Sequence, residues 1–288
     1  MTMNVVQKVS AAKSLELFVG NRNDNPAKDK WTAFEWDDPL HGKQVKGDLI
    51  VIRPEGSSGS LLSGLWRTSP VSSGCRPDGS CNVVYSAPVG DETILILEGE
   101  AHITVTKTGK KHHIKAGDII SHPKNLDVTW EIPAPFLKKM WVIWDSPNVA
   151  TPADAIYTGN ITGDADKWVP FEWNEPVHGP SKVGEVQVIR KVGSTGTLMC
   201  GLWRTGMTSP TRKADGSSEM RYSSPMGDET FFLLEGEAVL TVTQTGKQYH
   251  IKAGDIVGQP KNLDLHWSIK TPFLKKFWVI TDAELPKS

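Results

Sequence analysis

The sequence predicts an all-β chain built from two tandem antiparallel barrels or double-sheet jelly rolls. A block of about 137 residues occurs twice in tandem along the 288-residue chain. Within each block, short segments rich in β-branched residues alternate with turn residues. No stretch inside the repeat keeps a helical period for about ten residues. The length also suits two domains, because domains commonly have about 100–200 residues.

The duplication is visible in matching segments. WTAFEWDDPLHG at 31–42 returns as WVPFEWNEPVHG at 168–179, and FLKKMWVI at 136–143 returns as FLKKFWVI at 273–280. Between the copies lies a stretch of prolines and small polar residues that is typical of a linker. We therefore predict an N-terminal domain over residues 14–146 and a C-terminal domain over residues 152–288.

Short runs rich in β-branched and aromatic residues, bounded by turn residues, predict the strands of the first copy. In chain order they are 48–53, 82–85, 93–97, 102–106, 111–115, 118–121, 127–132 and 139–144. The turns between them contain Gly79, Gly99, Gly109 and Gly117. About eight short strands at this spacing are typical of a barrel or jelly roll.

Composition and charge exclude several classes of function. The 32 Lys and Arg residues nearly balance the 33 Asp and Glu residues and form no basic stripe, so we expect no nucleic-acid partner. No apolar run reaches the roughly 20 residues that span a bilayer, and the N-terminus lacks a secretion signal. Three cysteines exclude a disulfide scaffold. We expect a cytoplasmic protein without a membrane partner, either a monomer with internal pseudo-twofold symmetry or a homodimer.

Two segments of each copy resemble the signature segments of the cupin superfamily. In the first copy they are GDETILILEGEA at 90–101 and KAGDIISHPKN at 115–125. Glu92 and Gly99 fit the first signature, as Glu229 and Gly236 do in the second copy. Asn125 and Asn262 replace the last glycine of the second signature. Because asparagine tolerates positive φ, we expect this turn to survive.

Further segments are similar to one cupin subgroup, typified by (S)-ureidoglycine aminohydrolase and the ethanolamine-utilisation cupin. They are GLWRT at 64–68 and the closing strands LDVTWEI at 126–132 and LKKMWVI at 137–143. The resemblance covers nearly all of both copies. It implies a bicupin, with two tandem cupin double-stranded β-helix barrels of the RmlC-like jelly-roll type.

The usual cupin metal site is incomplete in both copies. The family holds its metal with two histidines before the glutamate, the glutamate itself and a later histidine. In the first copy the two early histidine positions hold either Tyr85 and Ala87 or Ser86 and Pro88, and the later one holds Val128. In the second copy the early positions hold either Tyr222 and Ser224 or Ser223 and Pro225, and the later one holds Leu265. We therefore predict no metal and no other cofactor. His122 has Gln259 at its repeat position and is interpreted as incidental.

Glu92 and Glu229 remain at the inward position without metal partners. A carboxylate buried alone is costly, so each needs a compensating group. Arg67 and Arg204 are candidates, and the resemblance favours Lys139 and Lys276 on the last strand of each copy. The alternative is an interior ion pair that binds no ligand.

The sequence also predicts aromatic residues near these charges. They are Trp66, Tyr85 and Trp130 in one copy, and Trp203, Tyr222 and Trp267 in the other. They suit the wall of a cavity for a small polar or carboxylate metabolite, although tryptophans are also common core residues. Trp66 and Arg67 are neighbours, so only one of them faces inward on a regular strand. The residues leave this choice open, and the resemblance favours the tryptophan.

Three functions remain open. The first is a metal-independent lyase, isomerase or hydrolase of a small acid, with Glu92 or Glu229 as acid and base and Tyr85 or Tyr222 as proton donor. The second is a non-catalytic module that binds or senses a small ligand. The third is a scaffold whose cavities are filled by their own side chains. Because both copies keep the same residues, we expect two similar cavities.

Overall fold

The computed structural model describes residues 15–23, 31–205 and 211–284, and in these ranges it is almost entirely β-structure. The exception is one short 3-10 helix, Ala165–Lys167. No helix among the described residues is long and apolar enough to cross a membrane. Residues 14, 24–30, 206–210 and 285–288 of the predicted domains lie outside the described ranges.

Two sheets form the N-terminal barrel, in the orders β12-β9-β6-β11-β4-β3-β2 and β5-β10-β7-β8, where β12 (Tyr157–Asn160) comes from the second half of the chain. The strands from this half of the chain are β2 (Thr32–Asp38), β3 (Gly42–Arg53), β4 (Ser60–Thr68), β5 (Cys81–Tyr85), β6 (Asp91–Glu98), β7 (Glu100–Val105), β8 (Lys111–Lys115), β9 (Asp118–His122), β10 (Val128–Ile132) and β11 (Leu137–Asp145). All sheet pairings are antiparallel, so the barrel closes as a jelly roll.

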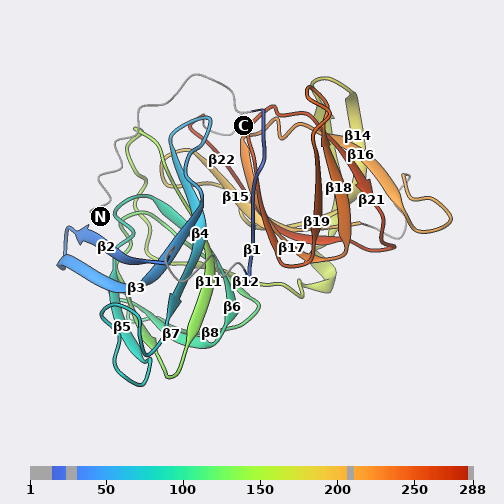
Figure 1. Ribbon diagram of the computed structural model, residues 1–288. Coiled ribbons are helices and arrows are strands. Elements are labelled where there is room, and N and C mark those ends of the chain that lie inside the picture. The colour runs from blue at the N-terminus through green and yellow to red at the C-terminus, as the bar shows by residue number, and fades with distance from the viewer. Residues whose placement is uncertain (1–14, 24–30, 206–210, 285–288) are drawn as a thin grey trace.

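The C-terminal barrel repeats this arrangement, in the orders β1-β20-β17-β22-β15-β14-β13 and β16-β21-β18-β19, where β1 (Phe18–Asn21) comes from the first half of the chain. Its strands are β13 (Val169–Glu175), β14 (Gly179–Arg190), β15 (Thr197–Arg204), β16 (Ser218–Tyr222), β17 (Asp228–Glu235), β18 (Glu237–Val242), β19 (Gln248–Lys252), β20 (Asp255–Gln259), β21 (Leu265–Ile269) and β22 (Lys275–Asp282). The two barrels lie side by side (Figure 1). The predicted all-β fold of two tandem barrels is thus confirmed.

Each predicted strand of the first copy is found, and the strand expected at Trp66 and Arg67 is β4, whereas β1 and β2 were not predicted. Glycine usually weakens a strand pattern, yet β4 has Gly64 in its middle. A Cβ on Gly64 would lie 1.8 Å from the Ile50 carbonyl oxygen of β3, so close strand packing requires the glycine. Asn125 and Asn262 have φ values of 64° and 63°, which confirms the expected positive-φ turn.

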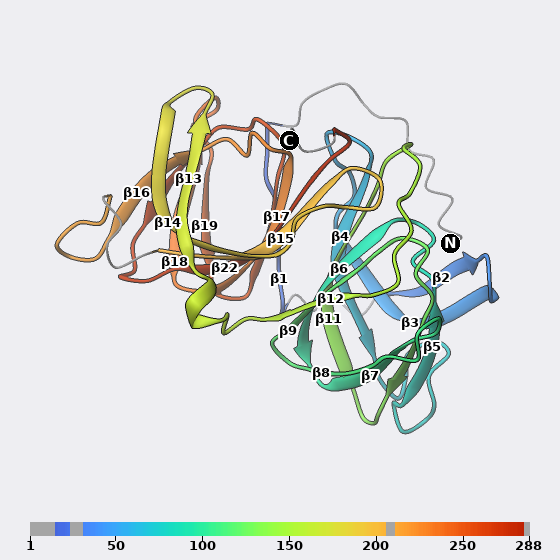
Figure 2. The same cartoon turned by 180° about the vertical axis from the view of Figure 1, so that it is seen from behind.

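The first strand of each repeat completes the large sheet of the other barrel. β1 (Phe18–Asn21) pairs with β20, and β12 (Tyr157–Asn160) pairs with β9. β1 accordingly lies against the C-terminal barrel in Figure 1, and β12 against the N-terminal barrel in Figure 2. The sequence repeats and the sheets therefore do not coincide at these strands. Each large sheet needs residues from both halves of the chain.

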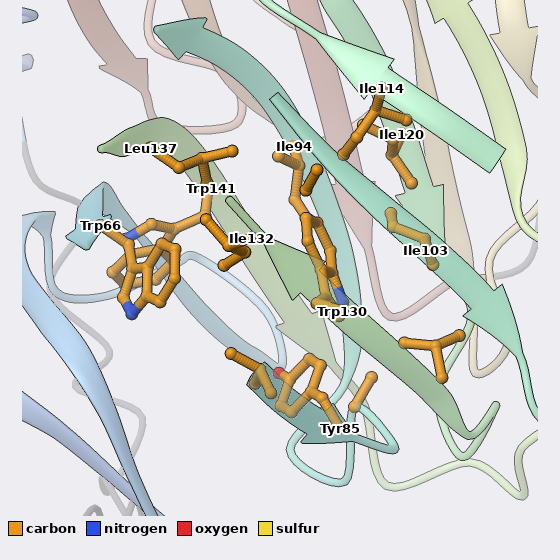
Figure 3. Close-up of a cluster of buried hydrophobic side chains, with 14 of the residues drawn as sticks. Trp66, Tyr85, Ile94, Ile103, Ile114, Ile120, Trp130, Ile132, Leu137 and Trp141 are labelled. Atoms are coloured by element: carbon orange, nitrogen blue, oxygen red, sulfur yellow. The ribbon is translucent and has the colours of Figure 1, made fainter. Parts of the chain in front are cut away.

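Three apolar clusters form the core. One fills the N-terminal barrel, where Trp66, Tyr85, Trp130 and Trp141 converge from several strands (Figure 3). A second fills the C-terminal barrel. The third contains residues of both halves, among them Trp144 and Phe277, and joins the two large sheets.

Two buried ion pairs cross between the barrels at equivalent places. Arg53 Nη2 lies 2.8 Å from Asp228 Oδ1, and Arg190 Nη2 lies 3.0 Å from Asp91 Oδ1. All four side chains are at most 2% exposed. Asp91 and Asp228 directly precede Glu92 and Glu229, so this interface holds the strands that carry the candidate site.

Candidate functional site

A lysine and a glutamate form an ion pair inside each barrel. In the C-terminal barrel Lys276 of β22 lies 2.6 Å (Nζ to Oε1) from Glu229 of the adjacent β17. In the N-terminal barrel Lys139 of β11 lies 2.8 Å from Glu92 of β6. The Lys276 pair is almost fully buried, whereas the Lys139 side chain is 12% exposed. The structure thus places both lysines inside the barrels and beside the two glutamates.

Strand alternation explains why the second lysine of each Lys-Lys pair points inward. Lys138 donates instead to the Arg22 carbonyl, and Lys275 to the Thr162 carbonyl, on the other side of their strands. The inner ammonium groups face aromatic rings. Lys276 Nζ lies 4.6 to 5.8 Å from four ring centroids, those of Phe231, Trp267, Tyr222 and Trp203. Lys139 Nζ lies 5.1 Å from the rings of both Trp66 and Trp130.

These surroundings set the electrostatics of the pair in the C-terminal barrel. Burial lowers the pKa of Lys276, and the charge and hydrogen bond of Glu229 oppose that shift. Cation–π contacts compensate part of the lost hydration of an ammonium group. Glu229 Oε2, the other carboxylate oxygen, is buried without a hydrogen-bond partner among the described residues.

A tyrosine stands beside the ion pair in each barrel. Burial raises the pKa of Tyr85 well above its usual value, and the charges of Glu92 and Asp38 raise it further. Burial and Glu229 raise the pKa of Tyr222 in the same way, while Ser224 opposes the shift. Both phenols therefore keep their protons at neutral pH. The Tyr85 hydroxyl has no hydrogen-bond partner in the described part of the chain.

His122 lies buried beside Glu92 and Tyr85 in the N-terminal barrel, a position that its interpretation as incidental did not anticipate. It is 1% exposed and lies opposite Glu92 in the β6–β9 register. Its ring centroid is 5.6 Å from that of Tyr85, and its Nε2 atom lies 2.5 Å from the Leu126 carbonyl oxygen. Burial lowers the pKa of His122, which favours the neutral imidazole. The pairing of the strands at 93–97 and 118–121 was the missing signal.

The same position holds Gln259 in the C-terminal barrel, opposite Glu229. Gln259 Nε2 donates to the carbonyls of Tyr222 and Leu263, at 3.1 and 2.9 Å. These two bonds fix the orientation of the amide. They leave Gln259 Oε1 buried and unpaired among the described residues.

Two further carboxylates, which the sequence did not identify, position the tyrosine strands. Asp38 accepts hydrogen bonds from the backbone and side chain of Ser86, the residue after Tyr85. Glu175 does the same for Ser223, the residue after Tyr222. Their acidic segments are repeated in the sequence, but only the fold shows what they contact.

A cavity of about 90 Å³ opens beside the pair in the C-terminal barrel. Its wall is mainly apolar and includes Trp203, Tyr222, Glu229 and Lys276. The remaining lining residues are Phe171, Val186, Val188, Met199, Met220, Met226, Trp278 and Ile280. Trp267 contributes indirectly, through its contact with Lys276.

The structure corrects the prediction that Arg67 and Arg204 bind a ligand. Arg67 stacks on Trp31 at 4.1 Å and Arg204 on Trp168 at 4.1 Å. Arg204 also pairs with Glu185 at 2.8 Å. They lie on the opposite side of their strands from the inward Trp66 and Trp203, because neighbouring strand residues alternate.

The residues at the cupin metal positions do not fit a metal. Of the donor set that the family uses, each barrel retains only the glutamate, and a lysine is paired with it. No three His, Cys, Asp or Glu side chains gather as a metal site among the residues that the structure describes.

The comparisons with known proteins agree with this architecture. A model of the EutQ-like cupin domain matches the chain twice, over residues 78–141 and 213–278. A search of curated protein sequences gave no match. The chain therefore contains two cupin domains and has the tandem cupin fold, that of a bicupin.

Several solved structures share this fold. A putative glyoxylate-induced protein from Pseudomonas aeruginosa is 12% identical, with a TM-score of 0.62 over 97% of this chain and 94% of that one. A protein of unknown function from Pseudomonas syringae is 13% identical, with a TM-score of 0.59 over 92% and 99%. Oxalate decarboxylase from Bacillus subtilis, which has Mn(II) centres, is 14% identical, with a TM-score of 0.54 over 96% and 79%. At these identities the similarity supports the fold alone.

Proposed function

We propose that this bicupin, within the subgroup typified by (S)-ureidoglycine aminohydrolase and the ethanolamine-utilisation cupin, binds a small polar or carboxylate metabolite inside its barrels. The cavity of the C-terminal barrel is the principal site. One observation carries the proposal: the Lys276–Glu229 pair forms the polar end of an apolar cavity, and Glu229 Oε2 has no partner among the described residues. A buried unpaired acceptor is costly, and a ligand with a donor relieves that cost. An open cavity also disfavours a barrel filled by its own side chains.

A ligand screen followed by thermal unfolding tests this proposal. A ligand at 100 times its Kd is expected to stabilise the chain by about 2.7 kcal/mol. Glu229→Gln keeps the size of the side chain but changes its hydrogen bonding, and Met220→Trp fills the cavity, so both are expected to abolish the stabilisation. Glu172→Gln, an exposed change on β13 of the same barrel, is the control and is expected to retain it. Equal stabilisation of Met220→Trp and the unmodified chain would place binding elsewhere.

Acid–base catalysis in the N-terminal barrel is a second candidate, favoured by the buried hydroxyl of Tyr85 beside the Glu92 carboxylate. The raised pKa of Tyr85 keeps a proton available for donation, and the neighbouring Glu92 carboxylate is placed to accept one. Tyr222 and Glu229 repeat this couple. A metal-independent isomerase, lyase or hydrolase of a small acid would use this chemistry.

Turnover assays on panels of small acids test the second candidate. In a Tyr222→Phe background, where the couple of the C-terminal barrel lacks its proton donor, Tyr85→Phe and Glu92→Gln are each expected to lower kcat by about 10²-fold or more, the usual contribution of a general acid or base. Glu100→Gln, an exposed change on β7 of the same barrel, is expected to leave kcat unchanged. A Tyr85→Phe variant with full activity in that background would exclude Tyr85 as the proton donor.

A further inference from the structure

The C-terminal barrel contains two buried acceptor atoms that lack partners within the described residues. Glu229 Oε2 and Gln259 Oε1 are both buried and unpaired. Their residues are directly opposite each other on β17 and β20, and side chains at such positions share one face of the sheet. The two oxygens, here called the acceptor pair, are best satisfied by N–H or O–H groups, and of the two residues Glu229 is the one that lines the cavity.

The nearby cation adds no net charge to this acceptor pair. Lys276 already donates to Glu229 Oε1, so the ion pair is neutral as a unit. Its ammonium group is also enclosed by aromatic rings, of which Phe231 and Trp267 are nearest. A ligand carboxylate would place a second negative charge near Glu229 Oε2, and no unpaired positive charge in the ion pair would compensate it.

The rest of the cavity wall favours a ligand with an apolar body. Met199, Met220 and Met226 line the cavity together with Phe171 and Trp278. Methionine side chains adapt to irregular shapes, and Met226 is 41% exposed. A cavity of about 90 Å³ has room for roughly six water molecules, which limits the enclosed part of a ligand to a few heavy atoms.

The N-terminal barrel does not repeat this acceptor pair. His122 occupies the position of Gln259, and its Nε2 atom is engaged with the Leu126 carbonyl. Val83 and Val89 stand where the second copy has Met220 and Met226. The two barrels therefore differ in the polar atoms and in the wall that they offer.

We infer that the C-terminal barrel binds an uncharged hydrogen-bond donor, an alcohol or primary amide on a short apolar body, through Glu229 Oε2. This inference rests on the proposed function, because it assumes that the cavity is a binding site. It narrows the ligand from polar or carboxylate metabolites in general to neutral donors.

Three probes of equal heavy-atom number separate the possibilities: butanamide, a neutral donor; butanoate, an anion; and 2-pentanone, which is neutral without a donor. Binding to the full chain is measured by ligand-observed NMR, since ligands of this size bind in the millimolar range at best. Butanamide is expected to bind at least tenfold more tightly than either of the others. The double variant Glu229→Leu/Lys276→Met, which replaces the ion pair by apolar side chains, is expected to remove that preference, and the exposed change Glu172→Gln to leave it intact.

The outcomes distinguish the inference from the proposed function. If butanoate binds best and Met220→Trp abolishes its binding, the cavity is a binding site but the inferred ligand class is overturned. Equal binding of butanamide and 2-pentanone overturns the class in the same way, because the acceptors would then contribute nothing. If no probe binds, or if Met220→Trp changes nothing, the proposed site and the inference fail together.

Discussion

Replacing Asp228 with alanine is expected to lower the free energy of unfolding by about 3–5 kcal/mol, the usual cost of removing one partner of a buried ion pair. Arg53 would remain buried in the interface without its counter-charge. The amide and hydroxyl of Ser57 and the amide of Lys261 would lose the same acceptor. Four donors converge on this one carboxylate, which places the variant among the most destabilising changes in the interface.

Urea unfolding at neutral pH measures this effect. Asp91→Ala removes the equivalent acceptor of Arg190 and Ser194, so a similar loss is expected. Glu172→Ala breaks the exposed pair with Lys182 and serves as the control, with an expected loss below about 1 kcal/mol. An Asp228→Ala variant as stable as the control would show that the barrels do not depend on the crossing pairs.

The same interface connects the two candidate sites. Arg53 extends from the N-terminal barrel and donates to the Glu229 carbonyl at 3.1 Å and to the Thr230 hydroxyl at 3.2 Å. It therefore holds the backbone of the residue whose carboxylate pairs with Lys276. The position of Glu229 in the C-terminal barrel is thus supported by the Arg53 side chain of the N-terminal barrel.

The strand pattern made the barrels predictable, but it did not show how they share strands. The segment FVGN at 18–21 and the segment YTGN at 157–160 are alike, and the edges offered by β9 and β20 are alike too. Either segment suits either edge. The local sequence therefore does not indicate whether a segment pairs with a strand of its own repeat or with a strand of the other repeat. Only the packing of the two large sheets decides it.

The candidate site was predictable where a single strand fixes side-chain direction. Alternation along the last strand, with the resemblance, indicated Lys139 and Lys276. His122 and Gln259 were missed because their proximity to the glutamates depends on pairing between separate strands. The unpaired oxygens of Glu229 and Gln259 depend on exact hydrogen-bond geometry, which no sequence pattern contains.

Replacing Glu229 with leucine is expected to destabilise the chain by about 3–5 kcal/mol at pH 7, because Lys276 would be left as an uncompensated buried charge. Burial already lowers the pKa of Lys276, and Glu229 is the group that opposes this shift, so the variant lowers it further. Between that lowered pKa and the ordinary lysine value near 10.5, the folded state binds fewer protons than the unfolded state. The stability of the variant therefore rises with pH through this window.

Urea unfolding at pH 7 and pH 9.5 checks both the size and the sign of this effect. The deficit of Glu229→Leu relative to the unmodified chain is expected to shrink at the higher pH, with a limiting slope of about 1.4 kcal/mol per pH unit for one proton. The double variant Glu229→Leu/Lys276→Met replaces the pair by apolar side chains and is expected to recover most of the loss at both pH values. Glu92→Leu is the matched control, with a smaller deficit because Lys139 retains contact with solvent. A deficit of Glu229→Leu that grew with pH would mean that the unpaired Lys276 is not the source of the instability.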